Sequence, residues 1–282
     1  MIIKTIKELD AQLAPYRNEG KTIGFVPTMG FLHEGHLSLI RRAKAENDIV
    51  VVSDFVNPTQ FAPNEDFESY PRDIVRDEEL ATSAGADFIF HPSVSEIYPE
   101  GSSTFVEVEG DITKVLCGES RPSHFKGVTT VVAILFNIVK ANKAYFGQKD
   151  AQQAAILIQM VRDLHMNIEL VVCPIIREED GLAMSSRNTY LSDEARKQSV
   201  VLNQSLLLAE GVFNNGENST NKLIKIIADK INEMPLAEID YVSIYDYPSL
   251  KVITKINQQA LAAVAVKFGN TRLIDNIILK RI

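Results

Sequence analysis

The chain has 282 residues, of which 45% are hydrophobic and 23% charged. That composition is typical of globular proteins and excludes wholesale disorder and fibrous classes. Lys and Arg number 29 and Asp and Glu 37, a net charge of −8, so the chain lacks the overall basic character of most nucleic-acid-binding proteins. The N-terminus lacks the features of a signal peptide, and no stretch has the ~20 apolar residues that span a bilayer. Cys117 and Cys173 lie far apart without metal-binding spacing, so we expect two reduced thiols in a soluble, cytoplasmic protein.

The first part of the chain alternates strand-like and helix-like segments. The valine-rich residues 48–56 are typical of a strand buried on both faces, and residues 170–175, around Cys173, are also expected to be a buried strand. Gly85 is a normal stop signal for the helix before it. This alternation predicts a parallel sheet with helices on both faces. The expected strands are residues 22–26, 48–56, 87–90, 143–146 and 168–173, and the expected helices are residues 36–46, 72–84, 128–141 and 151–164.

After about residue 176 the pattern changes. Two helices are expected, followed by three strands, and Gly269-Asn270 is a hairpin signal between the last two strands. We therefore expect two domains: residues 1–176 with the parallel sheet, and residues 177–282 as a smaller α+β domain. The expected helices of the second domain are residues 193–212 and 220–233, and its strands are residues 238–247, 260–268 and 272–279.

Parallel sheets of this kind bind ligands at the carboxyl ends of their strands. The first expected strand runs into the sequence PTMGFLHEGH at residues 27–36. A helix that begins there would favour phosphate at its N-terminus, with Gly35 allowing close approach and His33 and His36 donating hydrogen bonds. The alternative is a turn whose histidines only cap and pack. A zinc site fits less well, because the spacing is not His-Glu-x-x-His and no third ligand stands nearby.

Two further strands end in polar segments. Residues 57–61 read NPTQF; composition alone favours a turn, whereas a functional interpretation gives Asn57 and Gln60 amides that face a polar ligand. Residues 147–153 read GQKDAQQ, where Asp150 and Gln153 have the spacing of a capping box that needs no ligand. Lys149 at the end of this strand would reinforce an anion site, and the two interpretations are compatible.

The last polar segment is IREEDGLAMSSRN at residues 176–188. Gly181 suggests a flexible loop, and taken alone the segment is a solvated loop. Ser185, Ser186 and Arg187 nevertheless offer two hydroxyls and a guanidinium to phosphate oxygens, and residues 121–127 add further basic groups. Together these segments place histidine, lysine and arginine at the strand ends of one sheet in an otherwise acidic protein. That arrangement suits the polyphosphate of ATP.

The motifs at residues 27–36, 55–61, 146–153 and 177–188 closely resemble, in order, those of the pantoate–β-alanine ligase family. The resemblance implies a Rossmann-like N-terminal domain, a smaller C-terminal lid domain and a homodimer. It also implies ATP as co-substrate with Mg²⁺, and a reaction in two steps. Pantoate attacks the α-phosphorus of ATP to give pantoyl adenylate and pyrophosphate, and β-alanine then converts the adenylate to pantothenate and AMP.

The resemblance also implies residue roles. His36 is the general acid of adenylation, Lys149 and Arg187 hold phosphates, and no protein ligand of a metal is implied. Gln60 and Gln153 bind pantoate, Asn57 is assigned there too, and Gln60 also serves β-alanine. The implied ATP-binding residues are Met29, Gly30, Phe31, Leu32, His33, Glu34, Gly35, His36, Gly147, Gln148, Lys149, Asp150, Ile176, Met184, Ser185, Ser186 and Arg187.

Two residues depart from the family pattern, and two other functions compete. Asp54 stands where an apolar residue is usual, and a carboxylate inside a valine-rich strand is costly unless paired; Ser123 replaces a usual glycine. A nucleotidylyltransferase that acts on a phosphate ester would share His-x-Gly-His but would not explain the amides of Gln60 and Gln153. A non-catalytic nucleotide-binding regulator would bind ATP without releasing pyrophosphate in the presence of pantoate.

Overall fold

The computed structural model describes residues 1–62, 65 and 67–281, and the chain divides into two compact units. The first unit comprises Met1–Glu109, Arg121–Gly147 and Ile156–Pro174. The second comprises Gly110–Ser120, Gln148–Ala155 and Ile175–Ile282. The chain therefore passes twice from the first unit into the second and back before it enters the second unit for the last time.

The first unit is built on a six-stranded sheet of order β1-β4-β3-β2-β5-β6, in which every neighbouring pair is parallel. This confirms the predicted parallel sheet. Strand β1 has only two residues, too few for an alternating pattern, and was not predicted. The strands are β1 (Ile2–Ile3), β2 (Ile23–Thr28), β3 (Ile49–Asp54), β4 (Phe88–Phe90), β5 (Lys143–Gly147) and β6 (Glu169–Cys173).

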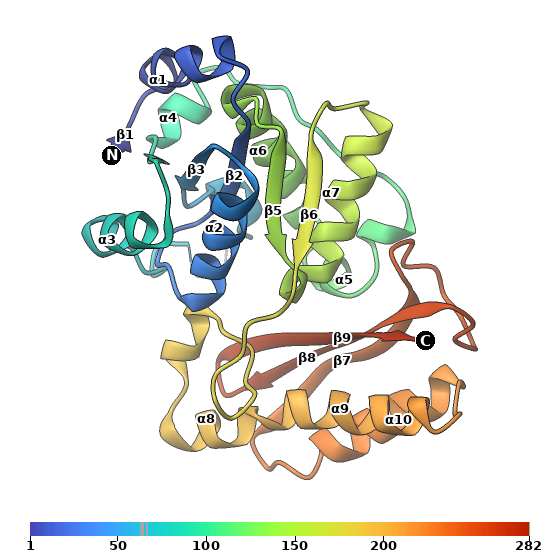
Figure 1. Ribbon diagram of the computed structural model, residues 1–282. Helices are drawn as coiled ribbons and strands as arrows, with labels where there is room; N and C mark the ends of the chain where they lie inside the picture. The colour runs from blue at the N-terminus through green and yellow to red at the C-terminus, as the bar shows by residue number, and fades with distance from the viewer. Residues whose placement is uncertain (63–64, 66, 282) are drawn as a thin grey trace. The chain divides into compact units, whose positions relative to one another are not determined.

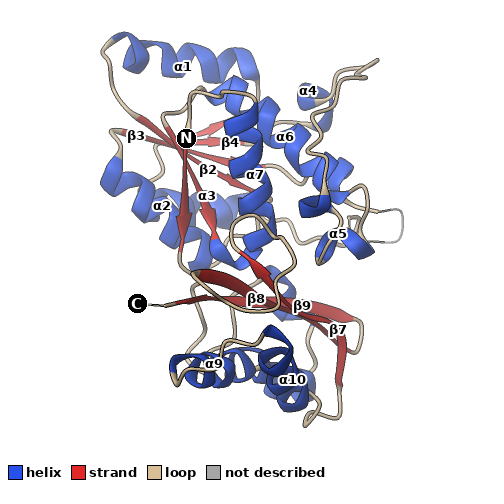
Figure 2. Ribbon diagram, turned by 90° about the vertical axis from the view of Figure 1, so that its right-hand side faces the viewer, coloured by secondary structure: helices blue, strands red, loops and turns tan. Residues whose placement is uncertain are grey.

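Helices cover both faces of this sheet, as predicted (Figure 1). One face packs against Leu13, Leu135 and Leu157 of α1, α6 and α7, and the other against Ile40 and Ala81 of α2 and α3. Figure 2 shows α2 on one side of the strands and α6 and α7 on the other. The helices are α1 (Ile6–Asn18), α2 (Glu34–Glu46), α3 (Ile74–Ala84), α4 (Val94–Ile97), α6 (His124–Val139) and α7 (Ala151–Asp163).

Strand β6 departs from the prediction of a buried strand. It is the last strand of the sheet, and of its five residues only Cys173 is buried. An edge strand has a neighbour on one side only, so its apolar side chains are only partly covered. Cys117 and Cys173 are both free thiols, as expected.

The second unit has an antiparallel sheet of order β7-β8-β9, which confirms the predicted α+β character. Its core joins Leu206 of α9 and Ile227 of α10 to Val264 of β8. The single helix expected over residues 193–212 is two helices, α8 and α9, which meet at Val200. Its elements are α5 (Cys117–Ser120), α8 (Asp193–Ser199), α9 (Val201–Asn214), α10 (Thr220–Ile231), β7 (Ala237–Asp246), β8 (Gln259–Phe268) and β9 (Thr271–Lys280).

Four 3₁₀ turns complete the described structure: η1 (Pro58–Gln60), η2 (Asp111–Thr113), η3 (Gln148–Asp150) and η4 (Ser186–Tyr190). Three of them lie in segments that the sequence marks as candidate binding loops. None of the helices in the described part of the chain is long and apolar enough to cross a membrane.

Candidate active site

The turn after β2 carries two histidines at the start of α2. His33 is the N-cap, and its Nδ1 accepts the backbone N–H of Gly35 at 3.1 Å. His36 Nδ1 accepts the backbone N–H of His33 at 3.3 Å, and the two rings pack against each other at a tilt of 30°, with their centroids 4.0 Å apart. The histidines therefore do cap and pack, as one interpretation of the sequence predicts.

This capping also fixes what the rings can offer to a ligand. Only an unprotonated nitrogen accepts an N–H, so the proton of each neutral imidazole is on Nε2. His33 and His36 thus carry Nε2–H donors at the N-terminus of a helix, where the unpaired N–H groups and the helix dipole favour an anion. Capping and phosphate binding are compatible because they use different ring nitrogens.

Gln60 lies against the same turn. Its Nε2 donates to Sδ of Met29 at 2.9 Å, which joins η1 to the residue that follows β2. Its Oε1 accepts from Asn57 Nδ2 at 3.1 Å. The structure therefore brings Met29, Asn57 and Gln60 together within the first unit.

The amide of Asn57 is committed to internal hydrogen bonds. The residue is only 1% exposed, and Nδ2 donates to Gln60 and to the backbone oxygen of Gly127. Oδ1 accepts from the hydroxyls of Thr59 and Tyr98 at 2.9 and 2.8 Å. An amide that is already saturated is suited to orienting Gln60, and has little capacity left for a ligand.

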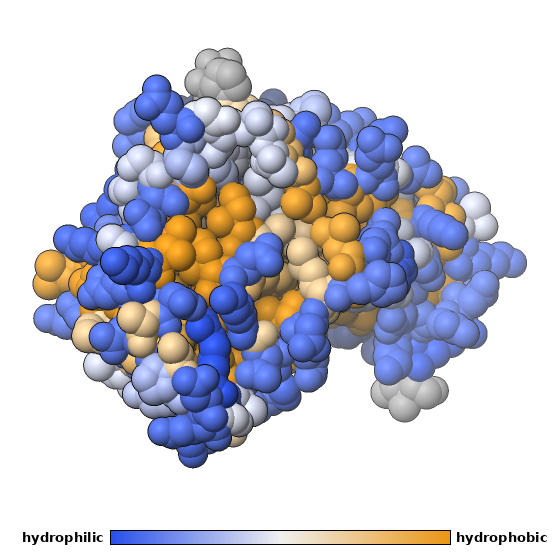
Figure 3. Space-filling view, turned by 90° about the horizontal axis from the view of Figure 1, so that it is seen from above, coloured by the Kyte–Doolittle hydropathy of each residue, from blue (hydrophilic) through white to orange (hydrophobic). Residues whose placement is uncertain are grey.

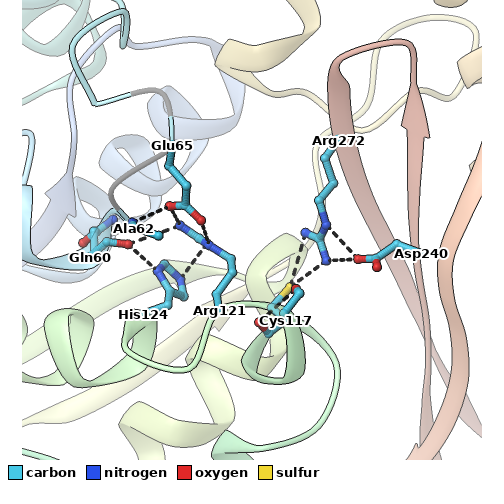
Figure 4. Close-up of polar contacts among 9 residues, drawn as sticks. Gln60, Ala62, Glu65, Cys117, Arg121, His124, Asp240 and Arg272 are labelled. Atoms are coloured by element: carbon cyan, nitrogen blue, oxygen red, sulfur yellow. Dashed lines mark hydrogen bonds and ion pairs between the residues drawn. The ribbon is translucent and has the colours of Figure 1, made fainter.

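A basic cluster holds the backbone of Gln60 from the other side (Figure 4). The backbone oxygen of Gln60 accepts from Arg121 Nη2 at 3.2 Å and contacts His124 Nδ1 at 2.9 Å. Arg121 also binds Glu65, whose carboxylate accepts the N–H of Ala62 at 3.2 Å. Burial acts to raise the pKa of Glu65, but the hydrogen bond and charge of Arg121 outweigh it, and the net pKa is lowered.

Asp54, the unusual carboxylate of the strand, lies directly beneath the histidine turn. A Cβ at Gly30 would lie 2.4 Å from Asp54 Oδ1, and Gly30 has φ +79°, a conformation that favours glycine. Nδ1 of His91 lies 2.8 Å from the backbone oxygen of Asp54 and 3.7 Å from its Oδ1. The hydrogen bond to Asp54 raises the pKa of His91, so this buried carboxylate is paired as burial requires.

Lys149 and its neighbours lie in the second unit, on a turn held by β9. Asn276 donates to the backbone oxygens of Gln148 and Lys149 at 3.0 and 2.9 Å, and Lys149 Nζ lies 3.8 Å from Asp150 Oδ1. The hydrogen bonds of a capping box between Asp150 and Gln153 are not found among the described residues, and α7 continues directly from η3. The amide of Gln153 has no hydrogen bond to any residue that the structure describes.

The side-chain amide of the neighbouring Gln152, in contrast, is buried and hydrogen-bonded within the second unit. It is 6% exposed, its Nε2 donates to the backbone oxygens of Ile112 and Val115, and its Oε1 accepts from the N–H of Cys117. Close to this anchor, Arg272 contacts Cys117 Sγ and Asp240 (Figure 4). Gln152 is a structural residue, although the sequence offers nothing to separate it from Gln153.

The segment from Ile176 to Arg187 is a hydrogen-bonded hairpin, which corrects the expectation of a flexible, solvated loop. Met184 N–H donates to Ile176 O at 3.0 Å, and Arg177 and Ala183 form a bridge. Gly181 has φ +97° at the turn. Ser185 caps η4 by accepting the N–H of Arg187 at 3.3 Å.

The candidate residues therefore fall into two sets, one in each unit. The first unit holds Met29, Gly30, Phe31, Leu32, His33, Glu34, Gly35, His36, Asn57, Gln60 and Gly147. The second unit holds Gln148, Lys149, Asp150, Gln153, Ile176, Met184, Ser185, Ser186 and Arg187. The hydrogen-bonding roles of Gln152, Asn276 and Arg121 were not predicted, because their partners are distant in sequence.

The chain is similar over nearly its whole length to proteins of one family. Residues 1–278 match the family model described as pantoate-beta-alanine ligase. The chain is 56% identical over 279 residues to the pantothenate synthetase of Acetivibrio thermocellus and 57% identical over 278 residues to that of Thermotoga neapolitana, with 99% of each chain covered.

Solved structures agree with this match. The crystal structure of pantothenate synthetase from Thermus thermophilus has a TM-score of 0.95 at 45% identity, covering 99% of both chains. The pantoate-beta-alanine ligase of Francisella tularensis, solved with beta-gamma ATP and beta-alanine, has a TM-score of 0.78 at 36% identity, covering 99% of this chain and 97% of that one.

Proposed function

The chain belongs to the pantoate–β-alanine ligase family, and we propose how its residues divide the work of joining pantoate to β-alanine with ATP. The reaction is an ATP-dependent condensation of these two substrates. In the proposed course, a carboxylate oxygen of pantoate attacks the α-phosphorus of ATP and pyrophosphate leaves. The β-alanine amine then attacks the carbonyl carbon of pantoyl adenylate, the bond between that carbon and the bridging oxygen breaks, and AMP leaves.

The observation that carries this assignment is the arrangement of His33 and His36. Their Nδ1 atoms accept backbone N–H groups, so each neutral ring carries its proton on Nε2, and we propose that these Nε2–H groups donate to the phosphates of ATP. His36 is the proposed general acid, which stabilises charge that develops as pyrophosphate leaves. The remaining residues from Met29 to Gly35 provide the turn that the nucleotide contacts.

Gln60 is the proposed ligand of pantoate and of β-alanine from the first unit. Its amide is oriented by Asn57 and Met29 and its backbone by Arg121 and His124. Because Asn57 is saturated, we propose that it acts on pantoate through Gln60. Preorganised neutral amides suit the hydroxyl groups of a hydroxy acid, since their hydrogen bonds need no rearrangement on binding.

Residues of the second unit are also proposed to bind substrates. Lys149 and Arg187 hold phosphates, Ser185 and Ser186 add hydroxyls, and Gln153 binds pantoate. The backbone of Ile176 and Met184, paired in the hairpin, is proposed to contact the nucleotide, as are Gln148 and Asp150. Gly147, the last residue of this segment in the first unit, is proposed to contact it too. Residues 1–176 would then act as the ATP- and pantoate-binding domain, and residues 177–282 as a lid that keeps water from the adenylate.

Mg²⁺ is proposed to enter with ATP. Among the residues that the structure describes, no group of three or more His, Cys, Asp or Glu side chains could hold a metal ion. Mg²⁺ commonly keeps several waters and is held through substrate phosphates and one or two carboxylates, so the donor set present fits an ion that the nucleotide carries. It would neutralise charge on the leaving pyrophosphate.

The enzyme is also proposed to be cytoplasmic and to form a homodimer. The face in Figure 3 carries a patch of apolar side chains among hydrophilic ones. Apolar surface gathered in this way often marks a contact with another protein. Sedimentation equilibrium would test the dimer. The mass of one chain is 31.4 kDa; a measured mass of twice that value supports the dimer, and a monomer at micromolar concentration contradicts it.

The proposed course of the reaction is tested by following two products in turn. Pyrophosphate release from ATP should require pantoate but not β-alanine, and AMP release should then require β-alanine. A nucleotidylyltransferase would retain the adenylyl group in its product, and a regulator that only binds ATP would release no pyrophosphate. Pyrophosphate release that also needs β-alanine would contradict a separate adenylation step.

A further inference from the structure

The turn that carries the histidine pair is held from inside by a buried carboxylate. Asp77 of α3 is 1% exposed. Its Oδ2 accepts the backbone N–H of Phe31 at 2.5 Å and its Oδ1 accepts the N–H of Leu32 at 2.7 Å. One side chain therefore binds the two residues that immediately precede His33. Asp77 is not among the residues assigned to the site above.

The backbone of this turn explains why it needs such a partner. Gly30 and Phe31 both have positive φ, +79° and +49°. This is an uncommon conformation for phenylalanine and persists only where the surroundings enforce it. Successive N–H groups in such a conformation converge on one point and form a cradle for an anion. In this chain the cradle of the turn holds the protein's own carboxylate.

Other groups hold the same turn and surround Asp77. Arg76 stacks on the ring of Phe31 at 5.0 Å and lies 3.7 Å from Asp77 Oδ1. Asp54 comes from β3 and lies beneath Gly30, and His91, which follows β4, lies beside Asp54. The charged groups that face Asp77 are therefore Arg76 from its own helix and Asp54 from the sheet, together with the two N–H dipoles of the turn.

We propose that Asp77 is a positioning residue for adenylation, whose ionised carboxylate holds the turn at Gly30–Leu32 so that His33 and His36 meet the phosphates of ATP. This inference rests on the proposed roles of the two histidines. The ionised form accepts both N–H groups. A protonated carboxyl turns one oxygen into a hydroxyl, which is a donor and only a poor acceptor, so the turn in effect loses one of its two internal bonds.

The protonation state of Asp77 changes within the pH range in which enzymes commonly work. Burial, and after it the charge of Asp54, raise the pKa of Asp77 to about 6 against the pull of the two N–H groups. At neutral pH the carboxylate is ionised and the turn is held by both bonds. As pH falls through about 6, one bond is lost and ATP binding and adenylation should weaken together.

Asp77→Asn tests this, with Glu79→Gln as the matched control. Glu79 lies on the same helix and is exposed, so its variant makes the same change in charge away from the turn. An asparagine at 77 keeps one acceptor oxygen but turns an NH₂ group toward a backbone N–H. At pH about 8, kcat/KM for ATP in pantoate-dependent pyrophosphate release should fall by about 10- to 100-fold, the effect expected from losing one hydrogen bond to a charged group.

The pH profile separates positioning from a structural role. The ratio of wild type to Asp77→Asn should be greatest above pH 7 and should shrink as pH falls through about 6, because wild type then loses the same bond. The ratio for Glu79→Gln should stay near 1 throughout, and Asp77→Glu should regain part of the activity. A folded Asp77→Asn with wild-type kcat, KM and acid limb overturns the proposal. If Asp77→Asn does not fold, Asp77→Ser, which also removes the charge and keeps one acceptor, is expected to give the same pattern. A folded Asp77→Ser with wild-type kcat, KM and acid limb would then overturn the proposal.

ATP affinity measured calorimetrically without pantoate keeps this test separate from the proposed function. Absence of pantoate-dependent pyrophosphate release in wild type would contradict the proposed function alone. Weaker ATP binding by Asp77→Asn at pH about 8, converging on wild type at low pH, would still support the positioning role. Equal ATP affinity of the two proteins at every pH would overturn it.

Discussion

The guanidinium of Arg121 binds both oxygens of Glu65, with Nε 2.5 Å from Oε1 and Nη2 2.6 Å from Oε2. The same Nη2 donates to the backbone oxygen of Gln60. A planar guanidinium can satisfy a carboxylate and a carbonyl together, which a lysine ammonium cannot do with the same geometry. Arg121 thus fixes the backbone of a proposed substrate ligand without itself being assigned to the substrate.

Arg121→Lys is therefore expected to raise KM for pantoate by about 5- to 20-fold, equivalent to losing one or two hydrogen bonds, with KM for ATP little changed. Lys126→Gln is the control, because Lys126 is a half-exposed cation on α6, the helix that follows Arg121, and it pairs with Glu107 at 3.1 Å. Steady-state kinetics with each substrate varied would show the difference. Equal effects of Arg121→Lys on pantoate and on ATP would contradict a role through Gln60.

Alanine replacements of the two adjacent glutamines of α7 should have opposite effects on stability and on pantoate affinity. Gln152→Ala removes the partner of two backbone oxygens and one N–H, so the free energy of unfolding should fall by about 2 kcal/mol or more. Gln153→Ala removes no hydrogen bond among the described residues, so melting should barely change while pantoate affinity falls by about 0.5–1.5 kcal/mol for each lost hydrogen bond. Thermal melts and pantoate titrations on both variants decide the matter. A destabilised Gln153→Ala with normal pantoate binding would remove it from the site.

Two replacements of His36 separate capping from catalysis. In His36→Asn the amide can take the place of Nδ1 and keep the cap, but no donor reaches the place of Nε2. In His36→Gln the longer amide can reach the place of Nε2. We expect His36→Asn to melt near wild type but to lose about 10²–10³-fold in adenylation rate, as for loss of one charge-stabilising donor, and His36→Gln to retain more activity. The reverse order of activities would show that the cap matters more than Nε2.

Lys149→Ala should lower adenylation to a similar extent, about 10²–10³-fold, because a positioned cation is lost from the proposed phosphate site. Folding should survive, since Lys149 pairs only loosely with Asp150, at 3.8 Å. Lys225→Ala, a change in an exposed ion pair with Asp229, serves as the control. Near wild-type pyrophosphate release by a folded Lys149→Ala would remove that residue from its role.

The pairing of His91 with Asp54 predicts a pH-dependent contribution to stability. The pKa of His91 is raised in the folded protein, so the folded state binds the proton more tightly than the unfolded state. The stabilisation is complete below the unfolded value of about 6.5 and is lost as pH rises through the folded pKa. The stability lost in His91→Gln, measured by urea unfolding, should therefore be larger at pH about 5.5 than at pH about 8.5. A loss that is equal at both, or larger at high pH, would contradict the pairing.

Periodicity and motif spacing were sufficient for the parallel sheet, the antiparallel second unit and the family resemblance. They failed where a residue's role depends on partners distant in sequence. Asn57 looks like a ligand amide, but it is saturated by Gly127 and Tyr98, which lie 70 and 41 residues further along the chain. Gln152 and Gln153 are indistinguishable until the fold turns one toward Ile112. Asp77 is one of many acidic residues on a helix, and only tertiary structure shows that it faces the turn.

Activation of the pantoate carboxylate by adenylation is the central step of the proposed reaction. Pantoate labelled with ¹⁸O in both carboxylate oxygens tests this in a single turnover sequence with ATP and β-alanine. One labelled oxygen becomes the bridge to the α-phosphorus and leaves with AMP, while the other stays in the amide of pantothenate. Mass spectrometry should therefore find one ¹⁸O in the phosphate of AMP and one in pantothenate. AMP without the label would contradict the adenylate and, with it, the roles assigned to the histidine turn.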